Sequence, residues 1–178
     1  MCVQRIARFS HSFTMYGKRR DYNGANGMRP TERLLEQLNK AFGGEAWYGP
    51  ALRDLLDGVT EEHAKKRPVA GAHTILELVV HIRTWMDVVA RRIAATDAVL
   101  TTVEDWSDLA GTSWDAAIEE LEHAQSRLVD AVARLSTERL DEKVSGKSHK
   151  VYDEVVGVIE HNVYHAGQIA LLRRALGI

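Results

Sequence analysis

The chain has few of the features that mark secreted, membrane-spanning and nucleic-acid-binding proteins. Its 178 residues include one cysteine, Cys2, which has no partner for an internal disulfide and therefore fits a reducing cytoplasm. No run of apolar residues approaches the roughly 18 needed to span a bilayer. With 23 basic and 25 acidic residues the net charge is -2, which argues against a dedicated nucleic-acid binder. We therefore expect a cytoplasmic protein that engages neither membranes nor nucleic acids.

Proline and glycine, the residues that most often end helices, are also scarce. The 3 prolines all precede residue 69, and glycine is absent from 72–110 and from 112–145. In these uninterrupted stretches apolar residues recur at spacings of three and four, which favours helices over strands. Four long amphipathic helices and moderate links predict an all-α fold, an antiparallel four-helix bundle. We expect long helices near 30–43, from Thr74 onward, from Thr112 or Ser113 onward and over 151–176, with short ones at 51–56 and 61–65.

The two parts of the chain differ in character. Residues 1–27 mix isolated apolar residues with arginine and lysine and end in a turn-prone run, so we interpret them as a flexible leader outside the fold. Residues 28–178 form the expected bundle domain. Within it, Thr74 and Glu77 have the spacing of a capping box, and Gly177 is a natural helix stop.

Three histidines fall on faces expected to be buried. His165 lies within the apolar stripe of the last helix, and His161 lies one turn before it on the same side, so that both rings can bind one ion. His81 follows Leu78 by three residues at the edge of the core of the second long helix. Unpaired polar rings in an apolar interior are costly. A shared divalent metal explains all three, and three protein nitrogens leave a position open for water, as in catalytic sites.

Other uses of these residues fit the sequence less well. The segment 161–165 lacks the zincin glutamate, since Asn162 stands in its place. A ferritin-like centre needs two Glu-x-x-His motifs, and the single match, Glu120 to His123, lies on a polar face. A purely structural bundle, with these three histidines satisfied without metal, stays open as an alternative. The remaining histidines are interpreted as surface residues: His11, His63, His73, His123 and His149.

The closing signature of the DinB-like (YfiT-like) metal-dependent hydrolases is similar to the segment HNVYHAGQIALLRR at 161–174. The family's second-helix segment resembles HTILELVVHIRTW at 73–85, and its first loop resembles AWYGPAL at 46–52, where relatives often carry histidine in place of Tyr48. The resemblance covers about 28–178. It implies an up-down-down-up four-helix bundle, often dimeric, with a divalent ion held by His81, His161 and His165.

The resemblance leaves the reaction open between hydrolysis and thiol S-transfer. In either case the substrate is a small molecule, with a low-molecular-weight thiol as one candidate, and the ion is zinc or nickel. The alternative from another class is a non-catalytic, metal- or ligand-binding stress-response bundle. Glu77 and Gln168 are candidates for supporting the metal ligands. Trp47 and Trp85 are candidates to wall the pocket, and Gly167 is interpreted as a site of close helix approach.

Overall fold

The computed structural model describes residues 27–94, 105–106, 109 and 111–178. Within these residues the chain is helical, and no β-strand forms. The predicted all-α fold is therefore confirmed. The leader expected at 1–27 lies almost wholly outside the described residues, as does most of the connection after the second long helix. The described helices are α1 (Pro30–Gly43), α2 (Leu52–Leu56), α3 (Glu61–Lys65), α4 (Ile75–Ile93), α6 (Trp114–Ala133), α7 (Thr137–Asp141) and α8 (Val151–Leu176).

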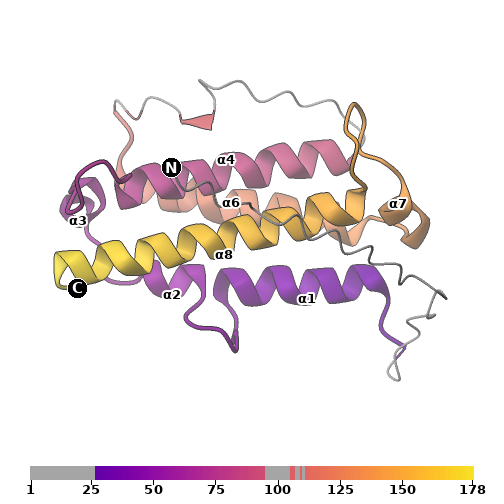
Figure 1. The fold of residues 1–178 in the computed structure, drawn as a ribbon, viewed down its shortest axis with the longest axis horizontal. Helices are drawn as coiled ribbons and strands as arrows, with labels where there is room; N and C mark the ends of the chain where they lie inside the picture. The colour runs from indigo at the N-terminus through magenta and orange to yellow at the C-terminus, as the bar shows by residue number, and fades with distance from the viewer. Residues whose placement is uncertain (1–26, 95–104, 107–108, 110) are drawn as a thin grey trace, which may run out of the picture.

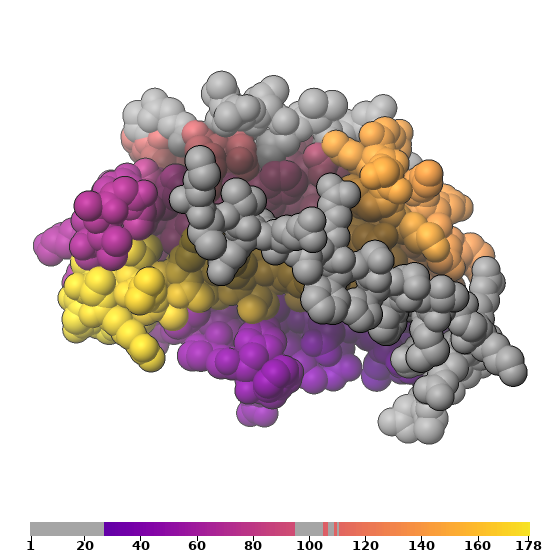
Figure 2. All heavy atoms as spheres, viewed as in Figure 1, coloured from indigo at the N-terminus to yellow at the C-terminus, as the bar shows by residue number. Residues whose placement is uncertain are grey.

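The four long helices surround one core (Figure 1). Helix α4 packs against α6 and α8, and α1 packs against the same two helices from the other side. In the space-filling view, α8 and α1 lie next to each other on the visible face (Figure 2). None of the helices in the described part of the chain is long and apolar enough to cross a lipid bilayer.

Contacts between side chains give the direction of each helix. Near the start of α4, His81 meets His161 of α8, whereas Arg92 at the end of α4 meets Glu154 at the start of α8. These two helices therefore run antiparallel. Asp87 of α4 pairs with Arg127 of α6, and residues at the ends of both helices line one cavity, so α4 and α6 run parallel. Because the first turns of α1 and α8 line one cavity, α1 runs in the direction of α8.

Local signals in the sequence place the helix ends. The side chain of Thr74 accepts a hydrogen bond from the N–H of Glu77, whose carboxylate accepts one from the N–H of Thr74, at 3.1 and 2.6 Å. This is the predicted capping box. Ser113 caps α6, and Gly177 ends α8 with a φ of 78°. The sequence analysis predicted no helix at the position of α7, which buries Leu140.

The core is formed by the apolar stripes of the long helices. Leu38, Ile82, Met86, Leu128 and Ile169 are fully buried and come from all four of them. Burial of large aliphatic side chains is the main force that holds such a bundle together. Several polar side chains are buried in the same interior, among them His81, Asn162 and His165. These need partners, and they mark where the bundle departs from a purely structural design.

Candidate metal centre

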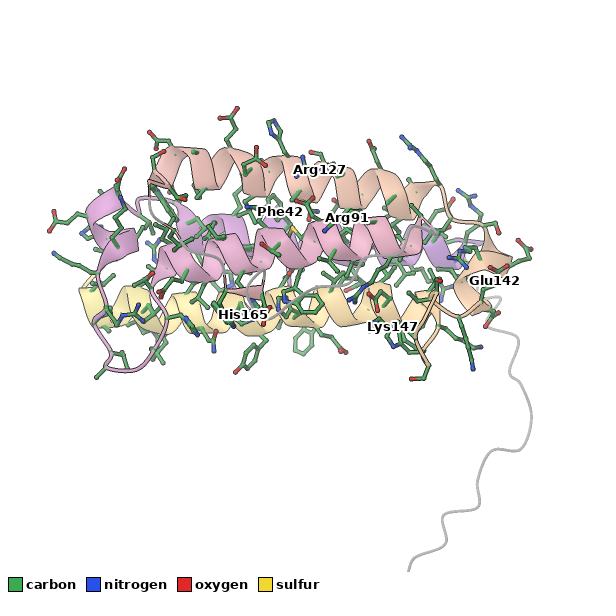
Figure 3. The ribbon with its side chains drawn as sticks, turned by 90° about the horizontal axis from the view of Figure 1, so that it is seen from above. Phe42, Arg91, Arg127, Glu142, Lys147 and His165 are labelled. Carbon is green, nitrogen blue, oxygen red and sulfur yellow. The ribbon has the colours of Figure 1, made fainter. Side chains whose placement is uncertain are left out.

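The three predicted histidines meet between α4 and α8. His81 comes from the second turn of α4, and His161 and His165 come from the middle of α8. Figure 3 shows His165 on the side of the bundle away from Arg127. The Nε2 atom of His161 lies 3.0 Å from Nε2 of His81 and 3.1 Å from Nε2 of His165. His81 and His165 are buried, and His161 is partly buried. The convergence inferred from helical spacing is therefore present in the structure.

The outer nitrogen of each ring faces an oxygen acceptor. His81 Nδ1 donates to the carbonyl oxygen of Asp105 at 2.9 Å, and His165 Nδ1 donates to Oε1 of Gln168 at 2.6 Å. His161 Nδ1 lies 3.5 Å from Oδ1 of Asn162. With the proton on Nδ1, each Nε2 carries a lone pair. The lone pairs of His81 and His165 thus face the place where Nε2 of His161 also lies, and a cation there would be bound by all three nitrogens.

This arrangement fits a divalent ion. Nitrogen ligands lie about 2.0–2.1 Å from zinc, so two ligands of one ion at angles of about 90–109° are about 2.9–3.4 Å apart. The two Nε2–Nε2 separations at His161 fall in this range. Metal-binding histidines usually donate the other ring N–H to a carbonyl, carboxylate or similar acceptor. The rings of His81 and His165 do so.

The surroundings of His161 and His165 favour the neutral form of these two rings. Burial lowers the pKa of His161 from 6.5 to about 4, with the neighbouring His165 and His81 adding to the effect. Burial also lowers the pKa of His165, although its hydrogen bond to Gln168 acts in the opposite direction. Neutral imidazole is the form that binds metal. His161 and His165 therefore remain available as ligands below the pH at which free histidine takes up a proton.

This shift makes the stability of the metal-free protein depend on pH. Between about pH 6.5 and pH 4 the unfolded chain protonates His161 and the folded chain does not, so the unfolding free energy falls as the pH is lowered. We expect His161 to contribute about 1 kcal/mol of this loss between pH 7 and pH 5, after allowing for its partial exposure. Urea unfolding of chelator-treated protein measures it. The variant His161→Gln should show a flatter dependence, and an unchanged slope would contradict the assignment.

Asp105 and Trp106 complete the surroundings of His81, and the sequence analysis did not single them out. The Trp106 indole stacks between the rings of His73 and His81, with centroid distances of 3.6 and 4.0 Å. Oδ1 of Asp105 accepts a hydrogen bond from Nε1 of Trp85 at 2.8 Å. These contacts fix the plane of the His81 ring. His73, interpreted as a surface residue, is exposed but takes part in this stack.

The structure also shows the surroundings of the supporting residues that the sequence analysis named. Gln168 contacts His165, whereas the carboxylate of Glu77 is held by Arg67 at 2.7 and 3.0 Å and by the capping box. Trp47 is 96% exposed and cannot wall the site, so that expectation was wrong. Gly167 is exposed, and a Cβ placed there would meet nothing within 4 Å, so it permits no close helix approach.

Comparison with known proteins adds a family-level match. The model of the DinB superfamily matches residues 49–169. The matched segment contains α4, α6 and most of α8, and with them all three histidines of the centre. None of the curated proteins shows a significant match to the chain.

Proposed function

The chain belongs to the DinB superfamily, and from this membership and its three-histidine centre we propose that it is a divalent-metal-dependent enzyme acting on a small molecule. The reaction is hydrolysis or thiol S-transfer. One observation carries the proposal, namely that the three Nε2 atoms converge while acceptor oxygens hold the proton on the outer nitrogens of His81 and His165.

His81, His161 and His165 would hold the ion, zinc or nickel, through Nε2. When bound, the ion supplies the positive charge that lowers the pKa of a water or thiol ligand at neutral pH. The protein supplies a fixed set of three neutral donors in a partly buried place. Three protein ligands leave a position free, which is typical of catalytic rather than structural sites.

Two carboxylates in the region of His81, those of Glu77 and Asp105, already accept hydrogen bonds. Glu77 accepts hydrogen bonds from Arg67 and from the N–H of Thr74. Asp105 accepts from Trp85 and lies 3.2 Å from Nδ1 of His81. Neither is free to remove a proton from a water molecule. This favours thiol S-transfer, because a thiol bound to the ion would lose its proton to solvent more readily than bound water would, and the resulting thiolate is itself the nucleophile.

Activity assays on protein loaded with zinc or nickel test the proposal. One assay follows consumption of a low-molecular-weight thiol with an electrophilic aryl halide, and the other follows hydrolysis of an activated ester. We expect metal-dependent acceleration of the first, absent from the metal-free protein and from His165→Ala. Acceleration of ester hydrolysis alone would favour a hydrolase. No acceleration of either reaction would favour the non-catalytic binding bundle.

Gln168 should tune the metal affinity without providing a ligand. Its Oε1 accepts the Nδ1 proton of His165 and so directs the Nε2 lone pair inward. Partners of this kind typically contribute a factor of about 10–100 in affinity. We expect Gln168→Leu to weaken zinc binding by that factor, and Gln168→Glu to retain it because its carboxylate also accepts the proton. Equal affinity of Gln168→Leu and the parent protein, in a chelator competition assay, would show that the contact is incidental.

The homodimer implied by the family resemblance and the cytoplasmic location stay proposals. Two large apolar side chains on α8, Tyr164 and Leu171, are 65% and 62% exposed, which is compatible with a contact between copies.

A further inference from the structure

A cavity of about 400 Å³ lies between α4 and α8, directly beside the three-histidine centre. His161 forms one end of it, and Glu154 and His149 lie toward the other. Binding sites for small molecules usually fall between about 300 and 1,000 Å³. The cavity is thus large enough for part of a small molecule whose other part lies at the centre.

The walls of the cavity are mainly apolar. Trp85 and Val89 line it from α4, and Val158 and Gly157 line it from α8. Gly157 precedes His161 by one turn, and a Cβ placed there would meet nothing within 4 Å. Glycine weakens a helix interior, and no packing contact requires it here. Its missing side chain widens the cavity next to the centre.

The far end of the cavity is lined by charged side chains, and those of opposite sign pair with each other. Arg92 and Glu154 are each 8% exposed, and Nη1 of Arg92 donates to Oε1 of Glu154 at 2.9 Å. The other oxygen of Glu154 bonds to Nε2 of His149. The guanidinium of Arg92 also lies 5.6 Å from the centroid of the Trp85 ring. The exposed Asp153 adds a second carboxylate to the lining. A ligand carboxylate would have to compete with Glu154 for Arg92, and a charged group left unpaired in this cavity is costly.

The length of the cavity follows from the helix. Seven residues separate Glu154 from His161, which corresponds to about 10 Å along α8. We propose that the cavity binds the uncharged, mostly apolar tail of the substrate, about 10 Å long, while the reacting end lies at the three histidines. This inference rests on the proposed function, because the centre defines where the reacting end lies.

Alkyl hydroxamates of increasing chain length are the probes. Their common head group binds zinc, and their tails differ by one methylene at a time. Isothermal titration of the zinc-loaded protein should give an affinity that rises about fourfold per methylene until the cavity is filled. A terminal carboxylate or ammonium on the longest tail should remove most of this gain. An affinity that does not change with tail length, or a charged tail that binds as well as the neutral one, would overturn the inference.

Two glycine variants on α8 locate the tail. Gly157→Leu fills the cavity and should weaken the longest hydroxamate at least tenfold, while acetohydroxamate changes less than twofold. Gly167→Leu is the matched control, because Gly167 is also exposed with open space at its Cβ but does not line the cavity. Equal losses in both variants, or in neither, would contradict the assignment of the cavity.

A metal-free measurement separates this inference from the proposed function. Addition of 1-hexanol to the metal-free protein should shift the NMR signals of the Gly157 amide and of the Trp85 indole N–H, and should not shift the Trp85 signal in Gly157→Leu. Failure of zinc to bind would refute the metal-dependent function, whereas absence of the hexanol shifts would refute the tail site.

Discussion

Replacement of His165 by alanine is expected to weaken zinc binding about 100- to 1,000-fold. Structural zinc sites in small domains have apparent binding free energies of about 10–16 kcal/mol, which amounts to about 2.5–4 kcal/mol for each of four ligands. His165 supplies one of three protein ligands, and its Nε2 lies 3.1 Å from that of His161. The substitution also removes the hydrogen bond between the His165 ring and Gln168. His161→Ala should have an effect of similar size, because Nε2 of His161 lies next to both other rings.

Competition with a chromogenic chelator measures this loss. His123→Ala is the matched control, since His123 is an exposed histidine on α6 and should leave the affinity unchanged. Circular dichroism at the same concentration establishes that each variant is folded. If His165→Ala and His123→Ala bound zinc equally, the histidines would be buried for another reason and the centre would not be a metal site.

Replacement of Glu154 by alanine is expected to destabilise the fold by about 3–5 kcal/mol, because it removes the buried carboxylate that pairs with the buried Arg92. The pair joins the end of α4 to the start of α8, 62 residues apart in the chain. Burial raises the pKa of Glu154, but the hydrogen bonds from Arg92 and His149 outweigh it, so that the pKa lies below 4.5. The carboxylate therefore adds stability above about pH 4.5 that is lost as the pH falls through its folded pKa.

Denaturant unfolding at pH 7 measures the effect of Glu154→Ala. Glu160→Ala is a control on the same helix, where the side chain is exposed and the expected change is within about 0.5 kcal/mol. The double variant Arg92→Met/Glu154→Leu replaces the pair by apolar groups and should recover most of the stability. A loss below about 1 kcal/mol in Glu154→Ala would contradict the assignment of the Arg92–Glu154 pair as a main source of stability.

The long helices could be predicted because their signals are local. Thr74 and Glu77 cap α4 by side chains three residues apart, and Gly177 ends α8 through its own left-handed backbone. Helix α7 was missed because it is short and mostly polar, and only Leu140 is buried in it. Its position depends on packing against α8, which no pattern within α7 reveals.

The ligands of the centre were predictable and their surroundings were not. His161 and His165 share a helix face by spacing alone, and His81 follows from the apolar stripe of α4. Asp105 and Trp106 lie in a connection, where no periodicity indicates which side chains point inward. His149, interpreted as a surface residue, bonds to the buried Glu154, because the loop that carries it folds back on the start of α8. Contacts of this kind depend on tertiary structure.

Elemental mass spectrometry of untagged protein purified without chelator tests the central claim most directly. The centre predicts about one zinc or nickel ion per chain, lost in the variant His161→Ala/His165→Ala and unchanged in His123→Ala. Absence of metal from the parent protein, with none acquired when zinc or nickel is added, would contradict the account. The three converging histidines would then need a different partner.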